Sequence, residues 1–300
     1  MATETQTEDA SRTRSRFEET LRIVVGNDLA KVGLVLLAIF VLMALLAPVI
    51  APHDPSARQT AEDGSWITNE GPSLTYPLGT TNGGFPIFSQ LVFGSRIAIF
   101  VGFLTALFVG GIGTFAGIVA GYYGGWIETA IMRLVDVAYG LPFLPFIIVL
   151  VIVLGNSVWN IVLAITVIAW RETARVIRSE VITIKELPMI DAARASGASD
   201  RRILVSHILP KVLPTTVLYS VFAIGWAILT EAGLSFLGFG ETGVISWGRM
   251  LQTAYSNQAL LQGLWFWIFP PGLCIMLLVM SMYFISQGVE EVVNPALRER

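Results

Sequence analysis

The sequence predicts an all-α polytopic membrane protein with six transmembrane helices, and three observations carry this prediction. Hydrophobic residues make up 54% of the 300 residues and charged residues only 14%, whereas soluble domains carry about 25% charged residues. Uncharged apolar runs recur along the chain, and a run of about 20 helical residues crosses the roughly 30 Å of a bilayer core. The lysines and arginines are concentrated in alternate connecting segments, as the positive-inside rule expects.

The six predicted spans are, in order, 32–52, 97–123, a third starting near Thr129, a fourth ending near Trp170, 212–239 and 259–289. The first is an uncleaved anchor, because its apolar run is longer than the roughly 7–15 residues of a signal-peptide core. The third and fourth share the uncharged stretch 137–170, which is too long for one helix and is interrupted by Gly, Asn and Ser at 155–157. Pro142 and Pro145 predict a bend in the third span.

Orientation follows from the basic residues. With a cytoplasmic N-terminus, 16 of the 19 Lys and Arg residues fall on the inside, in the segments 1–31, 122–133, 171–211 and 290–300. The predicted organisation is therefore a cytoplasmic tail (1–31), the first span (32–52), an extracytoplasmic loop (53–96), a five-helix core (97–289) with an inside loop at 186–210, and a second cytoplasmic tail (290–300).

The net charge and the positions of the cysteine, histidines and lysines exclude several classes of function. The net charge of −3 does not suit a nucleic-acid partner. Cys274 is the single cysteine, and His53 and His207 are far apart, so we expect no disulfide framework, metal site or other cofactor. A P-loop needs a lysine after glycine, and none of the three lysines follows one. We expect no catalytic residues, and any ATP that drives the protein must bind another polypeptide.

The inside loop 186–210 is patterned as two short helices. Pro188 suits a first helical position, Asp191 in the first turn complements the positive helix end, and Gly197 suits a C′ position with positive φ. Ser199 is the expected cap of a second helix that Pro210 helps to end. A loop of this shape is either a docking surface for another protein or a solvated interfacial loop, and the helix signals alone favour neither.

The same loop resembles the E-A-A---G---------I-x-L-P loop of ABC importer permeases. The matching residues are Asp191-Ala192-Ala193, Gly197 and Leu209-Pro210. Asp191 replaces the usual Glu and keeps its charge. His207 stands where Ile is usual, which is similar to the dipeptide and oligopeptide branch with its R-H-I-L-P sequence.

Further blocks extend the resemblance over residues 30–296. They are Pro77-Leu78-Gly79-Thr80, Gly121-Tyr122-Tyr123-Gly124-Gly125 with Met132-Arg133 and Asp136, Trp170 with Ala174-Arg175 and Arg178, and Glu231 with Leu234-Ser235-Phe236-Leu237-Gly238-Phe239-Gly240 and Trp247-Gly248. The chain departs from the branch at Thr81, at Gly84-Phe85-Pro86 and at Glu290 to Pro295. These departures weaken inferences about substrate and outer-loop contacts.

The resemblance implies an ABC type I importer fold and the C-type partner of a heterodimeric peptide permease. It implies a second homologous permease subunit, two ATP-binding cassette subunits, an extracytoplasmic substrate-binding protein and the plasma (inner) membrane of a prokaryote. Di- and oligopeptides are the implied cargo, with nickel or oligosaccharides as alternatives. The ATPase-coupling residues that it implies are Asp191, Ala192, Ala193, Gly197, Arg201, His207, Leu209 and Pro210.

Other polar residues have competing interpretations. Glu231, with Ser235 one turn away, is either a structural hydrogen-bonding group or part of a gate or pore, because a buried acid in a span is costly. Arg133 and Asp136 have the spacing of a local ion pair. Gly113, Gly117 and Gly121 fall on one helix face and predict close packing of two helices.

Two rival classes make different demands on the sequence. A secondary transporter or channel favours inverted repeats, discontinuous helices and several buried charges. An intramembrane enzyme needs a cluster such as His with Glu at ligand spacing, or paired aspartates. The sequence has one buried acid and no such cluster, which favours a permease subunit.

Overall fold

The computed structural model of the protein describes residues 23–294. Within this range the secondary structure is helical apart from two isolated β-bridges, so the predicted helical fold class is confirmed. The helices are α2 (Asp28–Leu45), α3 (Ala47–Ile50), α4 (Ile87–Tyr123), α5 (Gly125–Gly140), α6 (Phe143–Leu154), α7 (Val158–Lys185), α8 (Pro188–Ala195), α9 (Asp200–Ile203), the π-helical turn η1 (Leu204–Ile208), α10 (Leu209–Phe236), α11 (Trp247–Ser256) and α12 (Trp265–Val293). Most of the two predicted tails, 1–22 and 295–300, lies outside the described residues.

Four helical segments of the described chain are long and apolar enough to cross a membrane: α2, α4, α12, and α10 extended back to Asp200. The pair α5 and α6 makes a fifth candidate that is bent by 95° at its break. The remaining predicted span falls in the first half of α7, whose second half carries charged residues from Arg171 to Lys185. Length and composition therefore support four or five spans, and α7 has a mixed character.

Both predicted interruptions of the third and fourth spans are confirmed. Gly155 ends α6 with a φ of +96°, and the Ser157 side chain caps α7 by accepting a hydrogen bond from the Asn160 N–H at 3.2 Å. The break between α5 and α6 lies at Leu141 and Pro142, which are both extended. A proline disfavours helical geometry in the residue before it, and here this produces a right-angle turn.

Two helices differ from the expected boundaries. α4 begins at Ile87, so the last ten residues of the predicted 53–96 loop are helical. Buried Ile87 and Leu91 hold this extension in the core despite its polar residues. α11 lies within the expected connection between the fifth and sixth spans and was not predicted. It buries Trp247 and Ala254, which lie seven residues apart and so on one face of the helix.

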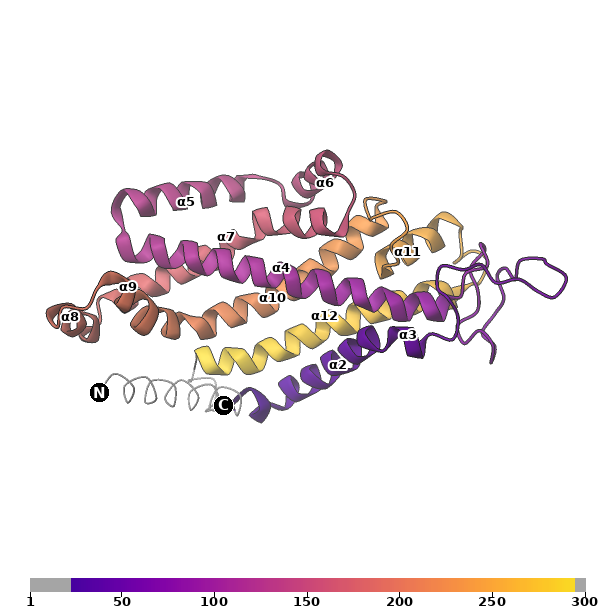
Figure 1. Ribbon diagram of the computed structural model, residues 1–300, viewed down its shortest axis with the longest axis horizontal. Coiled ribbons are helices and arrows are strands. Elements are labelled where there is room, and N and C mark those ends of the chain that lie inside the picture. The colour runs from indigo at the N-terminus through magenta and orange to yellow at the C-terminus, as the bar shows by residue number, and fades with distance from the viewer. Residues whose placement is uncertain (1–22, 295–300) are drawn as a thin grey trace.

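α4 is the central helix, packed along α7 on one side and α10 on another. The predicted close packing at Gly113, Gly117 and Gly121 is confirmed: a Cβ atom built on Gly117 would lie 2.7 Å from the Ala174 carbonyl oxygen of α7. α2 packs on α12 on one side of the bundle, and α5 runs beside α7 on the other side (Figure 1). α8 and α9 lie at one end of the long axis and α11 lies toward the other (Figure 1).

Candidate functional site

Helix α8 forms the first part of the 186–210 loop, and its end has the geometry that the sequence predicts. Gly197 follows the helix with a φ of +80°. The Gly197 N–H donates to the Arg194 carbonyl at 2.9 Å, and the Ala198 N–H donates to the Ala193 carbonyl at 3.0 Å. These two bonds make a Schellman motif, which requires a left-handed residue at C′. The predicted role of Gly197 as the C′ residue is confirmed.

The start of α8 also matches the prediction. Pro188 lies in the first turn, where a missing N–H breaks no bond of the helix. Asp191 is the acid of that turn, and its carboxylate lies 3.7 Å from the Arg194 guanidinium. Both side chains are largely exposed, so this pair contributes little to folding and its charges face outward.

The prediction for the second half of the loop is confirmed at its start and wrong at its end. A helix begins at Asp200 with Ser199 at its N-cap position, although the Ser199 side chain makes no capping hydrogen bond, and Pro210 does not end that helix. Instead α9, η1 and α10 run on as one helix from Asp200 to Phe236. In η1 the Leu209 N–H donates to the carbonyl of Leu204, five residues back. This wider turn, together with the place of Pro210 at the start of the next regular segment, accommodates a residue that lacks an N–H.

Three isoleucines fix the loop to the bundle. Ile190 of α8, Ile203 of α9 and Ile208 of η1 are fully buried. They belong to one hydrophobic cluster, the inner cluster, whose other buried members come from α4, α7 and α10: Ile118, Tyr122, Ile177, Val181, Ile184 and Val212. Burial of each such side chain stabilises by about 1.5–3 kcal/mol. The loop is therefore held as a packed element.

Two polar contacts reinforce this attachment. The Tyr122 hydroxyl at the end of α4 donates to the Asp200 carboxylate at 2.6 Å. The Lys185 ammonium at the end of α7 donates to the Gly121 carbonyl at 3.0 Å. Neither Tyr122 nor Lys185 was predicted as an anchor. Lys185 directly precedes the loop, whereas Tyr122 is far from it in the sequence and belongs to the Gly-Tyr block of the family resemblance.

The structure divides the predicted coupling residues into two groups. Asp191, Ala192, Gly197 and Arg201 are exposed, whereas Ala193, His207, Leu209 and Pro210 are half-buried. His207, Leu209 and Pro210 lie further along the continuous helix, away from α8. The exposed residues of α8 and of the turn that ends it are here called the α8 surface: Pro188, Met189, Asp191, Ala192, Arg194, Ala195, Ser196 and Gly197. Most of these side chains are small or charged, and Ile190 attaches the surface to the inner cluster.

Glu231 and Ser235 lie toward the opposite end of α10 and are both buried. The Ser235 hydroxyl donates to the Glu231 carboxylate at 2.7 Å. The space beside them is a cavity of only about 10 Å³, which Arg249 also lines. In this structure Glu231 is a buried group that accepts a hydrogen bond from Ser235, as the structural interpretation expects. Its role in a gate or pore stays a prediction.

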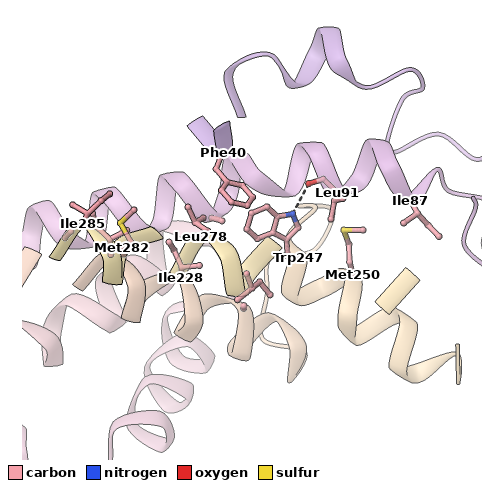
Figure 2. Close-up of a cluster of buried hydrophobic side chains, with 14 of the residues drawn as sticks. Phe40, Ile87, Leu91, Ile228, Trp247, Met250, Leu278, Met282 and Ile285 are labelled. Atoms are coloured by element: carbon pink, nitrogen blue, oxygen red, sulfur yellow. Dashed lines mark hydrogen bonds between the residues drawn. The ribbon is translucent and has the colours of Figure 1, made fainter. Parts of the chain in front are cut away.

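Helix α11 is joined to α4 and α10 beside this carboxylate. The Trp247 indole N–H donates to the Leu91 carbonyl of α4 at 2.8 Å, and the indole meets Phe40 edge-on (Figure 2). A Cβ atom on Gly94 would lie 2.6 Å from the Trp247 ring, and one on Gly248 would lie 2.2 Å from the carbonyl oxygen of a residue in α10. Trp247 and Gly248, which the sequence shows as a Trp-Gly pair, therefore pack α11 against α4 and α10.

A second set of charged residues joins α5 to α7. The predicted ion pair of Arg133 with Asp136 is wrong: Asp136 pairs with Arg175 of α7 at 3.0 Å, because the facing helix presents its cation closer than the same helix does. Arg178 pairs with Glu128 in the same way. Spacing of three and four residues among the α7 arginines was the signal that could have indicated this interface.

Comparison with known proteins places this geometry in a family. The family described as binding-protein-dependent transport system inner membrane component matches residues 113–299. The N-terminal TM domain of oligopeptide transport permease C matches residues 15–72. Two dipeptide transport system permease proteins DppC are similar over nearly the whole chain. That of Alkalihalophilus pseudofirmus is 34% identical over 97% of this chain and 93% of its own, and that of Bacillus subtilis is 32% identical over 95% and 87%.

Other relatives agree with this assignment. The glutathione transport system permease protein GsiD of Pectobacterium atrosepticum is 31% identical over 95% of this chain and 93% of its own. An inward-facing structure of the MetNI methionine ABC transporter aligns with a TM-score of 0.53 at 19% identity, covering 70% of this chain and 97% of the other. This second likeness concerns the fold. The chain therefore belongs to the binding-protein-dependent inner membrane components, the permease subunits of ABC importers, in their dipeptide and oligopeptide branch as a permease C.

Proposed function

We propose that this chain forms half of the translocation pore of a bacterial peptide importer and crosses the inner membrane six times. In this arrangement the bent pair α5–α6 and the apolar half of α7 supply two of the crossings. Both termini are cytoplasmic, because that orientation puts 16 of the 19 Lys and Arg residues inside. Support for the family comes from the match over residues 113–299.

The proposed cargo is a di- or oligopeptide. The relatives named above are described as permeases for dipeptides and for glutathione, itself a short peptide. Nickel or oligosaccharides are the alternatives within the same transporter type. A secondary transporter is the remaining alternative outside it, and the similarity to importer permeases over more than nine tenths of the chain argues against it.

The proposed partners are a second homologous permease, two ATPase subunits and an external substrate-binding protein, in a lipid membrane. The chain itself is the non-catalytic subunit. One observation carries the proposed ATPase contact: the α8 surface is exposed while Ile190 beneath it is fully buried. A push on this surface is transmitted to α4 and α7 through the inner cluster, because packed interiors deform little.

The test replaces Gly197 with valine. A β-branched residue at a φ of +80° is strained by roughly 1–2 kcal/mol, so the end of α8 changes shape. We expect the assembled transporter to lose most of its substrate-stimulated ATPase activity, or to lose the ATPase subunits on purification, while membrane insertion stays normal.

Gly263→Val is the matched control. Gly263 also has a positive φ, of +73°, and neither glycine has an atom within 4 Å of a built Cβ. It precedes α12, at the end of the bundle away from α8 (Figure 1). Normal coupling in Gly197→Val, or equal losses in the two variants, would contradict a specific role for the α8 surface.

A further inference from the structure

A cavity of about 310 Å³ lies between α4, α7, α10 and the α5–α6 break. Four aromatic side chains line it: Phe143, Tyr219, Phe222 and Trp226. Arg171 and Glu172 of α7 line it as well. Neither the Glu231 site nor the α8 surface contributes a residue to this cavity.

The depth of the cavity follows from the packing of α4 on α7. A Cβ atom on Gly113 would meet Trp170 and Thr173, so Arg171 lies level with Gly113. Gly113 precedes the end of α4 at Tyr123 by ten residues, which is a rise of about 15 Å. Arg171 is half-buried at this level, where the charged half of α7 begins. A half-buried charged residue that lines a cavity is a candidate for ligand binding.

Arg171 differs from the other arginines on its face of α7. Arg175 and Arg178, one and two turns further, each pair with a carboxylate of α5. Arg171 instead donates from Nη1 to the Ala138 carbonyl at 2.9 Å, and its guanidinium carbon lies 4.6 Å from the centre of the Tyr139 ring. Its Nε is buried without a hydrogen-bond partner among residues 23–294.

An arginine held in this way is suited to bind an anion. A guanidinium has five N–H donors and matches a carboxylate in bidentate geometry. Among residues 23–294 the guanidinium makes one hydrogen bond, from Nη1, so the N–H groups of Nη2 remain for a carboxylate that enters the cavity. None of the ion pairs within the described part of the chain involves Arg171, so no internal carboxylate competes with the ligand.

The remaining walls indicate the rest of the ligand. Glu172 also lines the cavity and is itself exposed, so the cavity presents both signs of charge to a zwitterion. The aromatic walls suit an apolar side chain. The volume is at the lower end of the roughly 300–1,000 Å³ of ligand pockets, which favours two or three residues over a longer chain.

We propose that this cavity is a peptide-binding site within the pore subunit, in which Arg171 binds the C-terminal carboxylate and Glu172 faces the N-terminal ammonium of a short peptide. This proposal rests on the proposed function, because a peptide reaches the cavity only if the protein transports one. It adds to that function a site between α4, α7 and α10 that selects for a free carboxyl terminus.

Thiol protection tests the site directly. In the assembled transporter in lipid nanodiscs, Cys274→Ala removes the single cysteine of this chain, and Ala169→Cys places a thiol on the cavity wall. The alkylation rate of this chain by N-ethylmaleimide is followed by mass spectrometry with alanylphenylalanine or its C-terminal amide. We expect the peptide to slow alkylation and the amide to need about tenfold higher concentration for the same effect, as one charge-assisted contact implies.

Arginine variants then identify the contact. In the Arg171→Gln variant we expect the peptide and its amide to protect the thiol equally poorly. In the Arg175→Gln variant, changed one turn away on the same face, we expect the tenfold preference for the peptide over the amide to remain. Equal protection by peptide and amide in the parent protein, or a preference that survives Arg171→Gln, would overturn the proposal.

ATPase activity in the same nanodiscs separates the two levels of the argument. Stimulation by the peptide-loaded binding protein together with absent protection overturns the cavity assignment and leaves the proposed function standing. Absence of both stimulation and protection by peptides overturns the proposed function and the cavity assignment with it.

Discussion

The two ends of the bundle are built in opposite ways. At the α8 end, called the inner end after the proposed orientation, the 186–210 loop is fixed by three buried isoleucines and by the Tyr122–Asp200 hydrogen bond, and its α8 surface stays exposed. At the outer end, α11 buries Trp247 and Gly248 against α4 and α10. The inner end keeps an exposed surface, which we propose as the contact for the ATPase, whereas the outer end closes on itself.

This difference concerns how the elements are held. Apolar side chains in a hydrophobic cluster tolerate replacement by others of similar volume. Glycine against a backbone carbonyl has no such freedom, since any Cβ atom must displace a helix. We therefore expect Gly248 at the outer end to respond most strongly to a small substitution, and the side-chain contacts of the 186–210 loop to show their defects mainly in coupling.

The largest effect is expected for Gly248→Ala. The added Cβ would lie 2.2 Å from the Ala232 carbonyl oxygen and 2.7 Å from the Ala232 Cα atom, so α11 must move away from α10. Overpacking of this kind costs about 3 kcal/mol or more. The measurement is the free energy of unfolding in mixed micelles, together with the abundance of the protein in membranes.

Gly233→Ala is its control. Gly233 lies beside Ala232 on α10 and has no atom within 4 Å of a built Cβ, so alanine there should be neutral or stabilising by up to about 1 kcal/mol. Equal stability of the Gly248→Ala and Gly233→Ala variants would contradict the close packing of α11 on α10 at Gly248.

Trp247→Phe should have the next largest effect. It removes the hydrogen bond to the Leu91 carbonyl and leaves space beside Phe40. We expect a loss of about 2 kcal/mol in the free energy of unfolding, from the lost bond and the cavity. Trp265→Phe, at an exposed position, should change stability by less than about 0.5 kcal/mol, and the same loss in both variants would contradict the prediction.

Tyr122→Phe is the corresponding change at the inner end. It removes the hydroxyl that donates to Asp200 and keeps the ring in the inner cluster. The expected loss is about 1 kcal/mol, because Asp200 is exposed and water replaces the donor. Coupling should suffer more than stability, which comparison of ATPase stimulation with unfolding would reveal. Tyr123→Phe, on the exposed neighbour, is the control, and a similar coupling defect there would argue against a specific contact.

Glu231→Gln should have the smallest effect. The amide oxygen of glutamine still accepts the hydrogen bond from Ser235, so stability should change by less than about 1 kcal/mol and transport should continue. If the variant assembles normally but peptide transport stops, the charge itself is required, and the gate interpretation replaces the structural one.

The sequence was most informative where the local chain geometry decides the structure. Gly197 with positive φ, the glycine stripe on α4 and the interruption at 155–157 depend on residues close in sequence, and all three predictions are confirmed. It failed where distant segments compete. Asp136 prefers Arg175 of another helix to Arg133 of its own, and Pro210 follows a π turn that no composition rule indicates.

The sequence by itself determined that this is a helical membrane protein of the importer permease family, because apolar runs and a distinctive loop are local patterns. Only the tertiary structure decided that residues 87–96 extend α4, that Trp247 is held by α4, and that Arg171 lines a cavity and forms no ion pair among residues 23–294. The physical reason is that burial and pairing depend on which surfaces meet. That information resides in the packed bundle and in no single stretch of the chain.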